Sequence, residues 1–427
     1  MSDPDEGAPE IPLLALRDGL TDVVDSRASL DQVIDAFRSG SGPIAIDAER
    51  ASGYRYSQRA YLIQIRREGS GTSLVDPIAF EDLDELNDAF GPAEWILHAA
   101  SQDLACLREV GLAPTTLFDT ELAARLLGYP RVGLATLVET ILGHSMRKEH
   151  SAVDWSQRPL PQPWLEYAAL DVEVLVELRD ILHEQLQEQD KLIWAEEEFE
   201  HLINMRPTPR EDPWRRTSGI HKVKNRRALA AVKELWTARD QLAQQRDTTP
   251  GRLIPDSAII VAATSLPASR HELLATKGFH GRGAKRFVRL WAEALDRARE
   301  LPESELPSPA RRNDAPPPMR TWIDRDPESA AQVLTAKSRL QEFSDARQVP
   351  IENLLTPDYL RRVIWRPPTG AGDLETAIKQ ALTDLGARPW QVQITAPMIT
   401  SAIEDPDPLP KKEPPKSPGD SSGSPAG

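Results

Sequence analysis

Residues 42–50, Gly-Pro-Ile-Ala-Ile-Asp-Ala-Glu-Arg, contain the segment that decides the fold. The apolar run at residues 44–46 follows a Gly-Pro pair and predicts a short buried strand. Because side chains alternate between the two faces of a strand, Asp47 and Glu49 point to the same side. Two carboxylates placed together repel each other, and a bound divalent cation such as Mg²⁺ or Mn²⁺ is the usual remedy.

Two later segments carry acidic residues at spacings that suit helices. The apolar pattern of residues 164–178 predicts a helix that begins after Pro163. On that helix Tyr167 and Asp171 are four residues apart and share one face, where a phenol can orient a water held by a metal. Asp103 lies near the start of another predicted helix, after an apolar strand. Carboxylates in such places can converge at the carboxyl edge of a sheet.

These segments resemble the tyrosine-containing branch of the DEDD superfamily of 3′-to-5′ exonucleases. The order Asp-x-Glu, His-Ala-x-x-x-Asp, Tyr-x-x-x-Asp is that of the superfamily, and the flanks at residues 61–65, 118–128 and 154–160 resemble ribonuclease D. The resemblance covers roughly residues 20–205. Ala48 stands where the family usually has threonine, and residues 148–153 match more loosely, but no acidic residue is lost.

The resemblance implies an α/β ribonuclease-H-like fold, a mixed sheet flanked by helices, and hydrolysis by a two-metal mechanism. Asp47 would bridge two divalent cations, Mg²⁺ or Mn²⁺. Glu49 and Asp171 would complete the first metal, and Asp103 would hold the second, partly through water. Tyr167 would position the attacking water together with Glu49. The product would be a nucleoside 5′-monophosphate released from the 3′ end.

Other residues near these motifs have more than one interpretation. Asp119 precedes a helical pattern, so a helix N-cap is favoured over a catalytic role. Arg158 either contacts phosphate or anchors a loop. His98 is expected to be a packing residue or a residue that supports a ligand, rather than a ligand itself, because oxygen-rich sites rarely use histidine. Tyr54 and Tyr56 either stack on a base or are ordinary loop aromatics.

The composition describes a globular, intracellular protein of about three domains. The chain has 427 residues, of which 40% are hydrophobic and 27% charged. Its single cysteine, Cys106, excludes an intrachain disulfide, and the acidic N-terminal segment lacks the apolar stretch of a signal peptide. The longest apolar runs are too short to cross a bilayer. We therefore expect a cytoplasmic protein that does not associate with membranes.

The net charge of −15 is distributed unevenly. Residues 215–300 hold eighteen lysines and arginines against eight acidic residues, a net charge of +10, which leaves −25 for the rest. A basic segment on an acidic protein is typical of nucleic-acid binding, although the arginines could simply coat a helical surface. The segment also resembles the helicase-and-ribonuclease-D C-terminal (HRDC) domain, a small helical bundle, through Leu235-Trp236, Arg239-Asp240, Arg246-Asp247 and residues 252–256.

This second resemblance implies weak nucleic-acid binding through phosphate contacts, which carry affinity but little sequence information. Trp236 and Trp291 lie on apolar stripes and are expected in the core. The candidate phosphate-binding residues are Lys222, Lys224, Arg226, Arg227, Arg282, Lys285 and Arg286.

The expected organisation runs from an extended or disordered N-terminus (1–19) to an exonuclease domain (20–205), an HRDC domain (215–300) and a proline-rich linker (301–318). A second HRDC-like helical domain (319–403) and a disordered tail (404–427) follow. The second helical domain is predicted because residues 347–348 and 354–360 echo residues 246–247 and 253–259. Strands are expected near residues 43–49, 60–66, 72–76 and 94–98.

The sequence thus predicts a metal-dependent 3′-to-5′ exoribonuclease that trims tRNA precursors or other structured RNA. Two alternatives stay open: a 3′-to-5′ exodeoxyribonuclease acting on single-stranded DNA in repair, and a nucleic-acid-binding scaffold without catalysis. RNA and DNA nucleases share the phosphoryl chemistry and differ in contacts to the 2′-hydroxyl, which no motif here reports.

Overall fold

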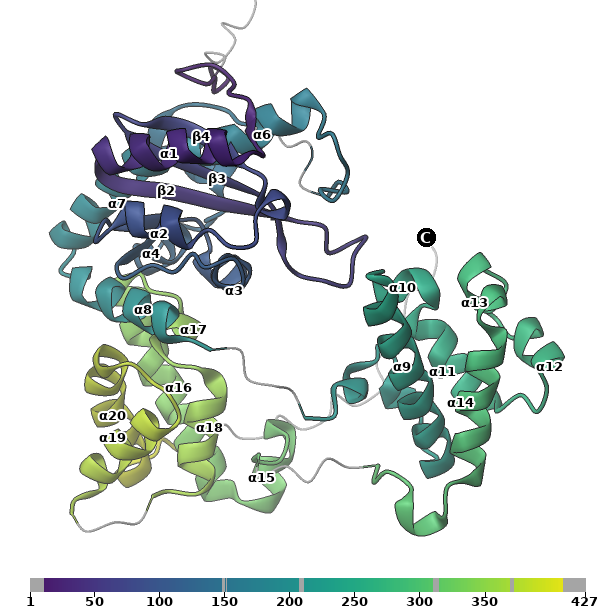
Figure 1. Ribbon diagram of the computed structural model, residues 1–427. Coiled ribbons are helices and arrows are strands. Elements are labelled where there is room, and N and C mark those ends of the chain that lie inside the picture. The colour runs from purple at the N-terminus through teal and green to yellow at the C-terminus, as the bar shows by residue number, and fades with distance from the viewer. Residues whose placement is uncertain are drawn as a thin grey trace, which may run out of the picture. The chain divides into compact units, whose positions relative to one another are not determined.

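The computed structural model describes residues 11–147, 150, 152–206, 211–309, 315–368 and 372–409. The chain divides into two compact units, Met1–Asn313 and Asp314–Gly427 (Figure 1). The first unit holds a sheet with flanking helices and then a helical bundle, and the second unit is helical. Among the described residues, no helix combines the length and apolarity needed to span a bilayer.

A six-stranded mixed sheet forms the centre of the first unit, with the strand order β1-β4-β3-β2-β5-β6. β2 runs antiparallel to β3 and parallel to β5, so the predicted mixed sheet is confirmed. All four strands predicted from the sequence are present, and two short edge strands, β1 and β6, are additional. The strands are β1 (Val23–Val24), β2 (Ser41–Arg50), β3 (Ala60–Glu68), β4 (Gly71–Val75), β5 (Trp95–Leu97) and β6 (Leu117–Asp119).

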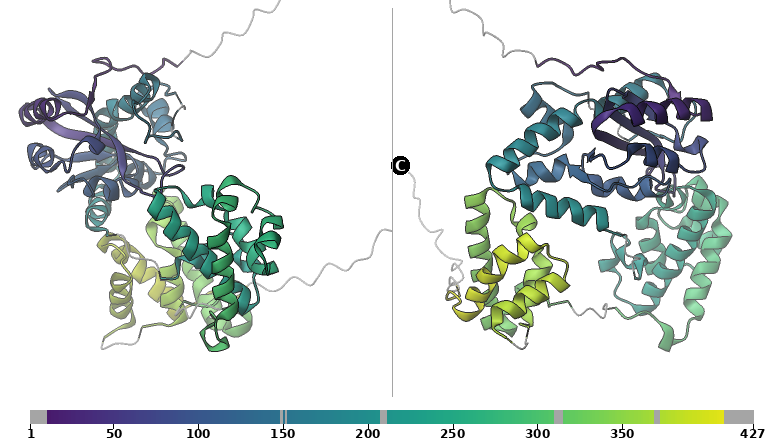
Figure 2. Two further views of the ribbon diagram at one scale, coloured as in Figure 1. Left: turned by 45° about the vertical axis from the view of Figure 1, so that its right-hand side comes forward. Right: turned by 60° about the vertical axis from the view of Figure 1, so that its left-hand side comes forward.

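Helices cover both faces of the sheet, as Figure 2 shows. On one face the aromatic side chain of Trp95 in β5 packs edge-on against Phe90, with ring centroids 5.6 Å apart. Its neighbour Ile96 points to the other face and joins a buried cluster with Val172 and Leu175. The first face is covered by α1 (Arg27–Ser39) and α2 (Asp84–Phe90), and the second by α6 (Gln162–Glu173) and α7 (Leu175–Glu188).

The helix predicted to begin after Pro163, at Trp164, begins two residues earlier, at Gln162, and is divided into two helices. Pro163 lies in the first turn of α6, where its missing N–H has no intrahelical partner to lose. At Val174 the backbone (φ −112°, ψ −2°) leaves helical values, and the chain restarts as α7. The apolar pattern continues through the break, which is why the sequence gives no sign of it. The remaining elements of this part are η1 (Pro77–Ala79), η2 (Ala100–Gln102), α3 (Leu104–Arg108), α4 (Thr120–Leu126), α5 (Leu134–Leu137), η3 (Val138–Leu142) and α8 (Leu192–Asn204).

The helical bundle of the first unit is built around α9, which packs against α11 and α14. Trp291 is fully buried in its core, and Trp236 packs against that core while partly exposed. The buried Arg239 donates to the carbonyl oxygen of Ile254 (3.0 Å) and pairs with Asp256 (2.8 Å), so it holds α9 to the start of α11. The helices are α9 (Arg226–Arg246), α10 (Pro250–Leu253), α11 (Asp256–Ser265), α12 (Arg270–Ala275), α13 (Arg282–Arg286) and α14 (Val288–Glu300), after η4 (Pro213–Arg216) and η5 (Ile220–Lys222).

The second unit repeats the local plan of α9–α11, in line with the sequence echo. α16 has 21 residues like α9, and each ends at a left-handed residue, Gln348 (φ 52°) and Asp247 (φ 42°) respectively. A four-residue helix and a longer helix follow in both. Helices of this unit are α15 (Trp322–Arg325), α16 (Pro327–Arg347), α17 (Ile351–Leu354), α18 (Pro357–Trp365), α19 (Leu374–Asp384) and α20 (Pro389–Glu404), after η7 (Met319–Thr321).

Parts of the expected linker and termini lie outside the described residues, namely 1–10, 310–314 and 410–427. The described start of the linker contains η6 (Glu303–Glu305) and the buried Leu306. Near the N-terminus Leu13 forms an isolated bridge with Ser145. The domain boundaries themselves stay predictions.

Candidate functional site

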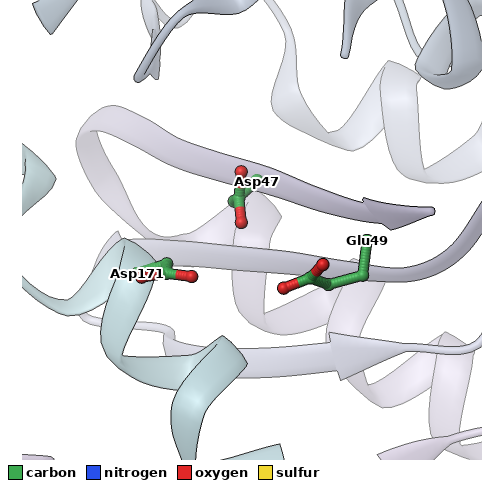
Figure 3. Close-up of side chains that lie close together, drawn as sticks. All are labelled: Asp47, Glu49 and Asp171. Carbon is green, nitrogen blue, oxygen red and sulfur yellow. The ribbon is translucent and has the colours of Figure 1, made fainter. Parts of the chain in front are cut away.

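Three of the predicted acidic residues meet where β2 approaches α6. Ligand oxygens of Asp47, Glu49 and Asp171 all lie within 4.8 Å of one another. Figure 3 shows Asp47 and Glu49 projecting from the strand and Asp171 from the helix toward a common space. The alternation of β2 and the packing of α6 on the same face of the sheet explain why residues about 120 positions apart converge.

Asp103 joins the same site from the parallel neighbour strand. It follows β5 through the short turn η2, and its side chain is buried. Although it is not part of the tightest trio, it lines the same cavity of about 420 Å³. Residues of all three sequence motifs line this cavity: Asp47, Glu49, Asp103, Tyr167 and Asp171.

The turn that presents Asp103 is held by Asp119. Ala99 adopts a left-handed conformation (φ 62°), and the Asp119 carboxylate accepts hydrogen bonds from the backbone N–H groups of Ala99 (3.1 Å) and Ala100 (2.8 Å). The same carboxylate caps α4 by accepting from the N–H groups of Glu121 (2.9 Å) and Leu122 (3.1 Å). The predicted N-cap is therefore confirmed, and its additional bonds link the helix to the turn that presents Asp103.

The pKa values of all four acidic residues are raised. Burial, reinforced by the neighbouring Asp47, Asp171 and Asp103, raises the pKa of Glu49 to about 10. Burial also raises the pKa values of Asp47, Asp103 and Asp171, and for the last two the charge of Asp47 adds to the effect. Such shifts in a cavity mark a functional candidate, because ionising the cluster costs free energy that a bound cation would recover.

Tyr167 and His98 also line the cavity. The Tyr167 hydroxyl donates a hydrogen bond to Asp171, and burial next to these carboxylates raises the pKa of the phenol. His98 lies 2.9 Å from the Thr120 hydroxyl through its Nδ1, and burial lowers its pKa to about 4. His98 therefore stays neutral near pH 7 and borders the cavity.

Arg50 is a cavity residue that sequence reasoning missed. Strict alternation would place it with Ala48 on the face opposite to Asp47. The pairing register between β2 and β3 shifts after Glu49, however, and the Arg50 guanidinium lies 3.5 Å from Asp103 Oδ1. Register irregularities of this kind redirect side chains, and nothing in the sequence signals one here.

The two aromatic candidates after β2 contact the helical bundle of the same unit. Tyr56 packs against the bundle core, and its hydroxyl lies 3.0 Å from Asp240 Oδ1. Asp247 Oδ1 accepts from the N–H groups of Tyr56 (3.1 Å) and Ser57 (2.9 Å). The Arg252 guanidinium lies 4.1 Å from the ring centroid of Tyr54. Both tyrosines therefore contribute to the contact between the loop after β2 and the helical bundle.

Arg158 is a loop anchor in the structure. Its guanidinium pairs with Asp76 (2.6 Å and 2.8 Å) and donates to the carbonyl oxygens of Tyr61, Trp155 and Gln157. All of its donor directions are used within the protein, so the loop role accounts for the residue fully.

The seven basic candidates fall into two groups. Arg226 donates to the carbonyl oxygens of Leu306 and Glu303, and Arg227 to those of Ala298, Arg299 and Leu301, so both stabilise the end of the bundle. Arg286 lies over the ring of Phe287. The remaining four candidates are exposed and, among the residues that the structure describes, form no ion pair: Lys222, Lys224, Arg282 and Lys285.

One of these four exposed residues, Lys224, lines a cavity with basic side chains. Lys224 lines a hollow of about 420 Å³ together with Arg216 and His221, over an apolar floor that includes Ile220 and Val223. Phosphate binding by these residues stays a prediction.

The donor set of the acidic cavity fits hard divalent cations. Four carboxylates provide only oxygen ligands, which Mg²⁺ and Mn²⁺ prefer. The trio of Asp47, Glu49 and Asp171 lies on regular elements, β2 and α6, and needs little rearrangement to converge on one ion. The acidic cluster in this fold therefore points to divalent metal binding.

Comparisons with known proteins identify three related domains along the chain. A family model described as "3'-5' exonuclease" matches residues 22–187, one for the HRDC domain matches residues 228–295, and one described as "3' to 5' exonuclease C-terminal domain" matches residues 315–403. The predicted fold, an exonuclease domain followed by helical domains, is thereby confirmed.

Similar whole proteins cover much of the chain. Ribonuclease D from Shewanella sp. (strain ANA-3) is 29% identical over 391 residues, covering 87% of this chain and 92% of that protein. Ribonuclease D from Zymomonas mobilis is 33% identical over 282 residues, covering 64% and 70%. A crystal structure of a protein from Bifidobacterium adolescentis matches with a TM-score of 0.83 and 36% identity, covering 93% of this chain and all of that one.

The crystal structure of Escherichia coli RNase D matches with a TM-score of 0.66 at 24% identity, over 90% of this chain and 98% of that one, and shows the shared fold. Together with the sequence relatives and the 3′-5′ exonuclease domain, these matches confirm the resemblance identified from the motifs. The chain belongs to the ribonuclease D family.

Proposed function

We propose that this protein is a metal-dependent 3′-to-5′ exoribonuclease that releases nucleoside 5′-monophosphates from RNA ends. The observation that carries the proposal is the cavity in which Asp47, Glu49, Asp103 and Asp171 meet beside Tyr167. Membership in the ribonuclease D family and the exonuclease domain support the reaction class.

The four carboxylates would hold two divalent cations, Mg²⁺ or Mn²⁺. Such a pair supplies an activated water and neutralises the charge that develops on the scissile phosphate. Asp47 would serve both cations, Glu49 and Asp171 would complete one, and Asp103 would hold the other, which the convergence of the trio and the shared cavity support.

The chain's own residues supply the orientation. The Tyr167 hydroxyl donates to Asp171, which fixes the phenol at the cavity wall beside Glu49. From there it can position a water for in-line attack without losing its own proton, because its pKa is raised. Asp119 fixes the turn before Asp103, so that this carboxylate keeps its place in the cavity wall.

The proposed substrates are the 3′ ends of tRNA precursors or other structured RNA. The basic bundle that follows the exonuclease domain would add affinity through phosphate contacts. The alternative substrate, single-stranded DNA, is favoured by no specific contact among the described residues, and the choice depends on recognition of the 2′-hydroxyl.

The decisive experiment uses a structured RNA with a 3′ tail and a DNA of matched sequence. Each is incubated with the protein and Mg²⁺ or Mn²⁺, with a chelator reaction alongside. We expect stepwise shortening of the RNA that stops on chelation and yields nucleoside 5′-monophosphates. Preferential shortening of DNA would replace the RNA proposal, and binding without shortening of either substrate would favour the scaffold alternative.

A further inference from the structure

Arg50 provides the positive side chain that lies against the acidic cluster, and the catalytic roles assigned above make no use of it. Its side chain is 26% exposed and borders the cavity, while Asp103, its partner, is 8% exposed. The 3.5 Å separation is a charge contact rather than a tight hydrogen bond. The guanidinium therefore balances part of the cluster's negative charge while remaining close to solvent.

A cation bound at Asp103 would repel the Arg50 guanidinium. Asp103 is one of the carboxylates proposed above to hold a divalent cation, so the guanidinium and that cation compete for the same negative charge. Like charges a few ångströms apart in a half-buried site repel each other more strongly than in bulk water, because the effective dielectric constant of protein sites is only about 20. The two cannot both lie against Asp103 without a large cost.

Phosphate is the natural new partner for the released guanidinium. The planar fork of arginine matches the oxygens of a phosphate in a bidentate geometry, and the residue stands at the end of β2 on the wall of the cavity that would receive the RNA end. Glu49, its chain neighbour, belongs to the acidic trio, so Arg50 is attached directly to the framework of the site.

We propose that the Arg50 guanidinium pairs with the Asp103 carboxylate in the metal-free protein. When the cation binds, the guanidinium leaves Asp103 and contacts a phosphate of the RNA 3′ end. This inference rests on the proposed nuclease function and adds a substrate-contacting residue to it. Because metal and RNA would then assist each other through one side chain, their binding is coupled, and by linkage the coupling is reciprocal.

The inference predicts opposite effects on metal and RNA binding, which a structural role would not produce. In Arg50→Gln the competing charge is absent, so Mn²⁺ measured by calorimetry on the RNA-free protein should bind about tenfold more tightly. In the same variant the KM for a 3′-tailed RNA should rise about tenfold, and inhibition by adenosine 5′-monophosphate should weaken similarly. Arg50→Lys keeps the charge without the fork, so its Mn²⁺ affinity should stay near wild type while its KM rises.

Other outcomes overturn the inference. Weaker binding of both Mn²⁺ and RNA in Arg50→Gln would mean that Arg50 only holds Asp103 in place, and unchanged values for both would make the pair incidental. Arg38→Gln, which removes one exposed positive charge in the last turn of α1, controls for net charge. Thermal unfolding of each variant checks the fold, and Arg50→Lys remains informative if Arg50→Gln is unstable.

The proposed function and this inference fail in different ways. If the wild-type protein neither binds Mn²⁺ nor shortens RNA, the nuclease proposal fails. If the wild type does both and Arg50→Gln behaves like it, only the role of Arg50 is wrong.

Discussion

The acidic cavity and the basic helical bundle of the same unit both collect charge, but they do so by different means. In the cavity, four carboxylates come from β2, α6 and the turn after β5, are largely buried, and have raised pKa values. In the bundle, eighteen lysines and arginines within residues 215–300 are mostly spread over the surface, and several stabilise the bundle itself. Buried charge of one sign specifies a ligand, whereas exposed charge provides attraction that many sequences could supply.

The largest effect is expected from Asp171→Ala. Loss of this side chain removes one of three converging carboxylates that are proposed to bind metal, so RNA turnover should fall by a factor of about 1,000 or more, while RNA binding changes only a few-fold. Single-turnover shortening of a 3′-tailed RNA and a binding titration measure the two effects. Asp180→Ala, an exposed aspartate on α7, is the matched control. Turnover near wild type in Asp171→Ala would remove this residue from the site.

The second effect concerns pH in the metal-free protein. The pKa of Glu49 rises from 4.5 to about 10, so the folded state binds more protons than the unfolded state between these values. The stabilising contribution of protonated Glu49 is complete below pH 4.5 and is lost as the pH rises toward 10. With chelator present, the Tm should therefore fall between about pH 5 and 9, and added Mg²⁺ should restore it most at high pH.

Glu49→Gln should flatten this slope because its amide does not titrate. The exposed Glu139→Gln should leave the slope unchanged. Calorimetric scans across the pH series provide the measurement, and equal slopes for wild type and Glu49→Gln would contradict the origin assigned to the effect.

A moderate effect on activity is expected where Asp247, at the end of α9, holds the loop that follows β2. Asp247→Gly keeps the left-handed backbone favourable but removes the carboxylate that accepts from Tyr56 and Ser57. Tyr56 and Ser57 lie in the loop after β2, the strand that carries Glu49. Because releasing this loop would disturb the position of Glu49, kcat/KM for RNA should fall roughly tenfold. Steady-state kinetics and the thermal stability of the bundle are measured together.

Gln348→Gly makes the same change at the equivalent left-handed position of α16. It should leave kcat/KM within about twofold of wild type, because it removes none of the hydrogen bonds by which Asp247 holds the loop after β2. Equal losses in both variants would show that backbone flexibility, rather than the Asp247 hydrogen bonds, causes the effect.

The smallest effect is expected from the exposed lysines of the bundle. Lys222→Ala combined with Lys224→Ala should weaken RNA binding a few-fold and reduce the slope of log affinity against log salt by about 0.7 for each phosphate that is no longer neutralised. The pair Arg320→Ala and Arg325→Ala, exposed in the second unit, is the control. If both pairs change the slope equally, the basic excess of residues 215–300 has no special role.

Much of this molecule follows from local sequence rules. Three features depend only on residues that are close together in the sequence. They are the strand that carries Asp47 and Glu49, the helical spacing of Tyr167 and Asp171, and the N-cap at Asp119. These are the features that alternation, helical periodicity and capping describe, and the structure contains all of them.

Other features escaped prediction because they depend on pairing between distant segments. The redirection of Arg50 requires a register shift against β3, and the additional bonds of Asp119 require β5 and β6 to lie side by side. The division of α6 from α7 at Val174 is hidden because the apolar pattern continues through it.

The sequence alone determined the elements, the motif order and the uneven charge, because propensity, periodicity and composition are local properties. Tertiary structure decided which charges meet. It brought Asp103 and Arg50 together, engaged Arg158, Arg226 and Arg227 in internal bonds, and directed Tyr56 to the bundle. The physical reason is that electrostatic interactions depend on distance and burial in space, which arise only after strands pair and helices pack.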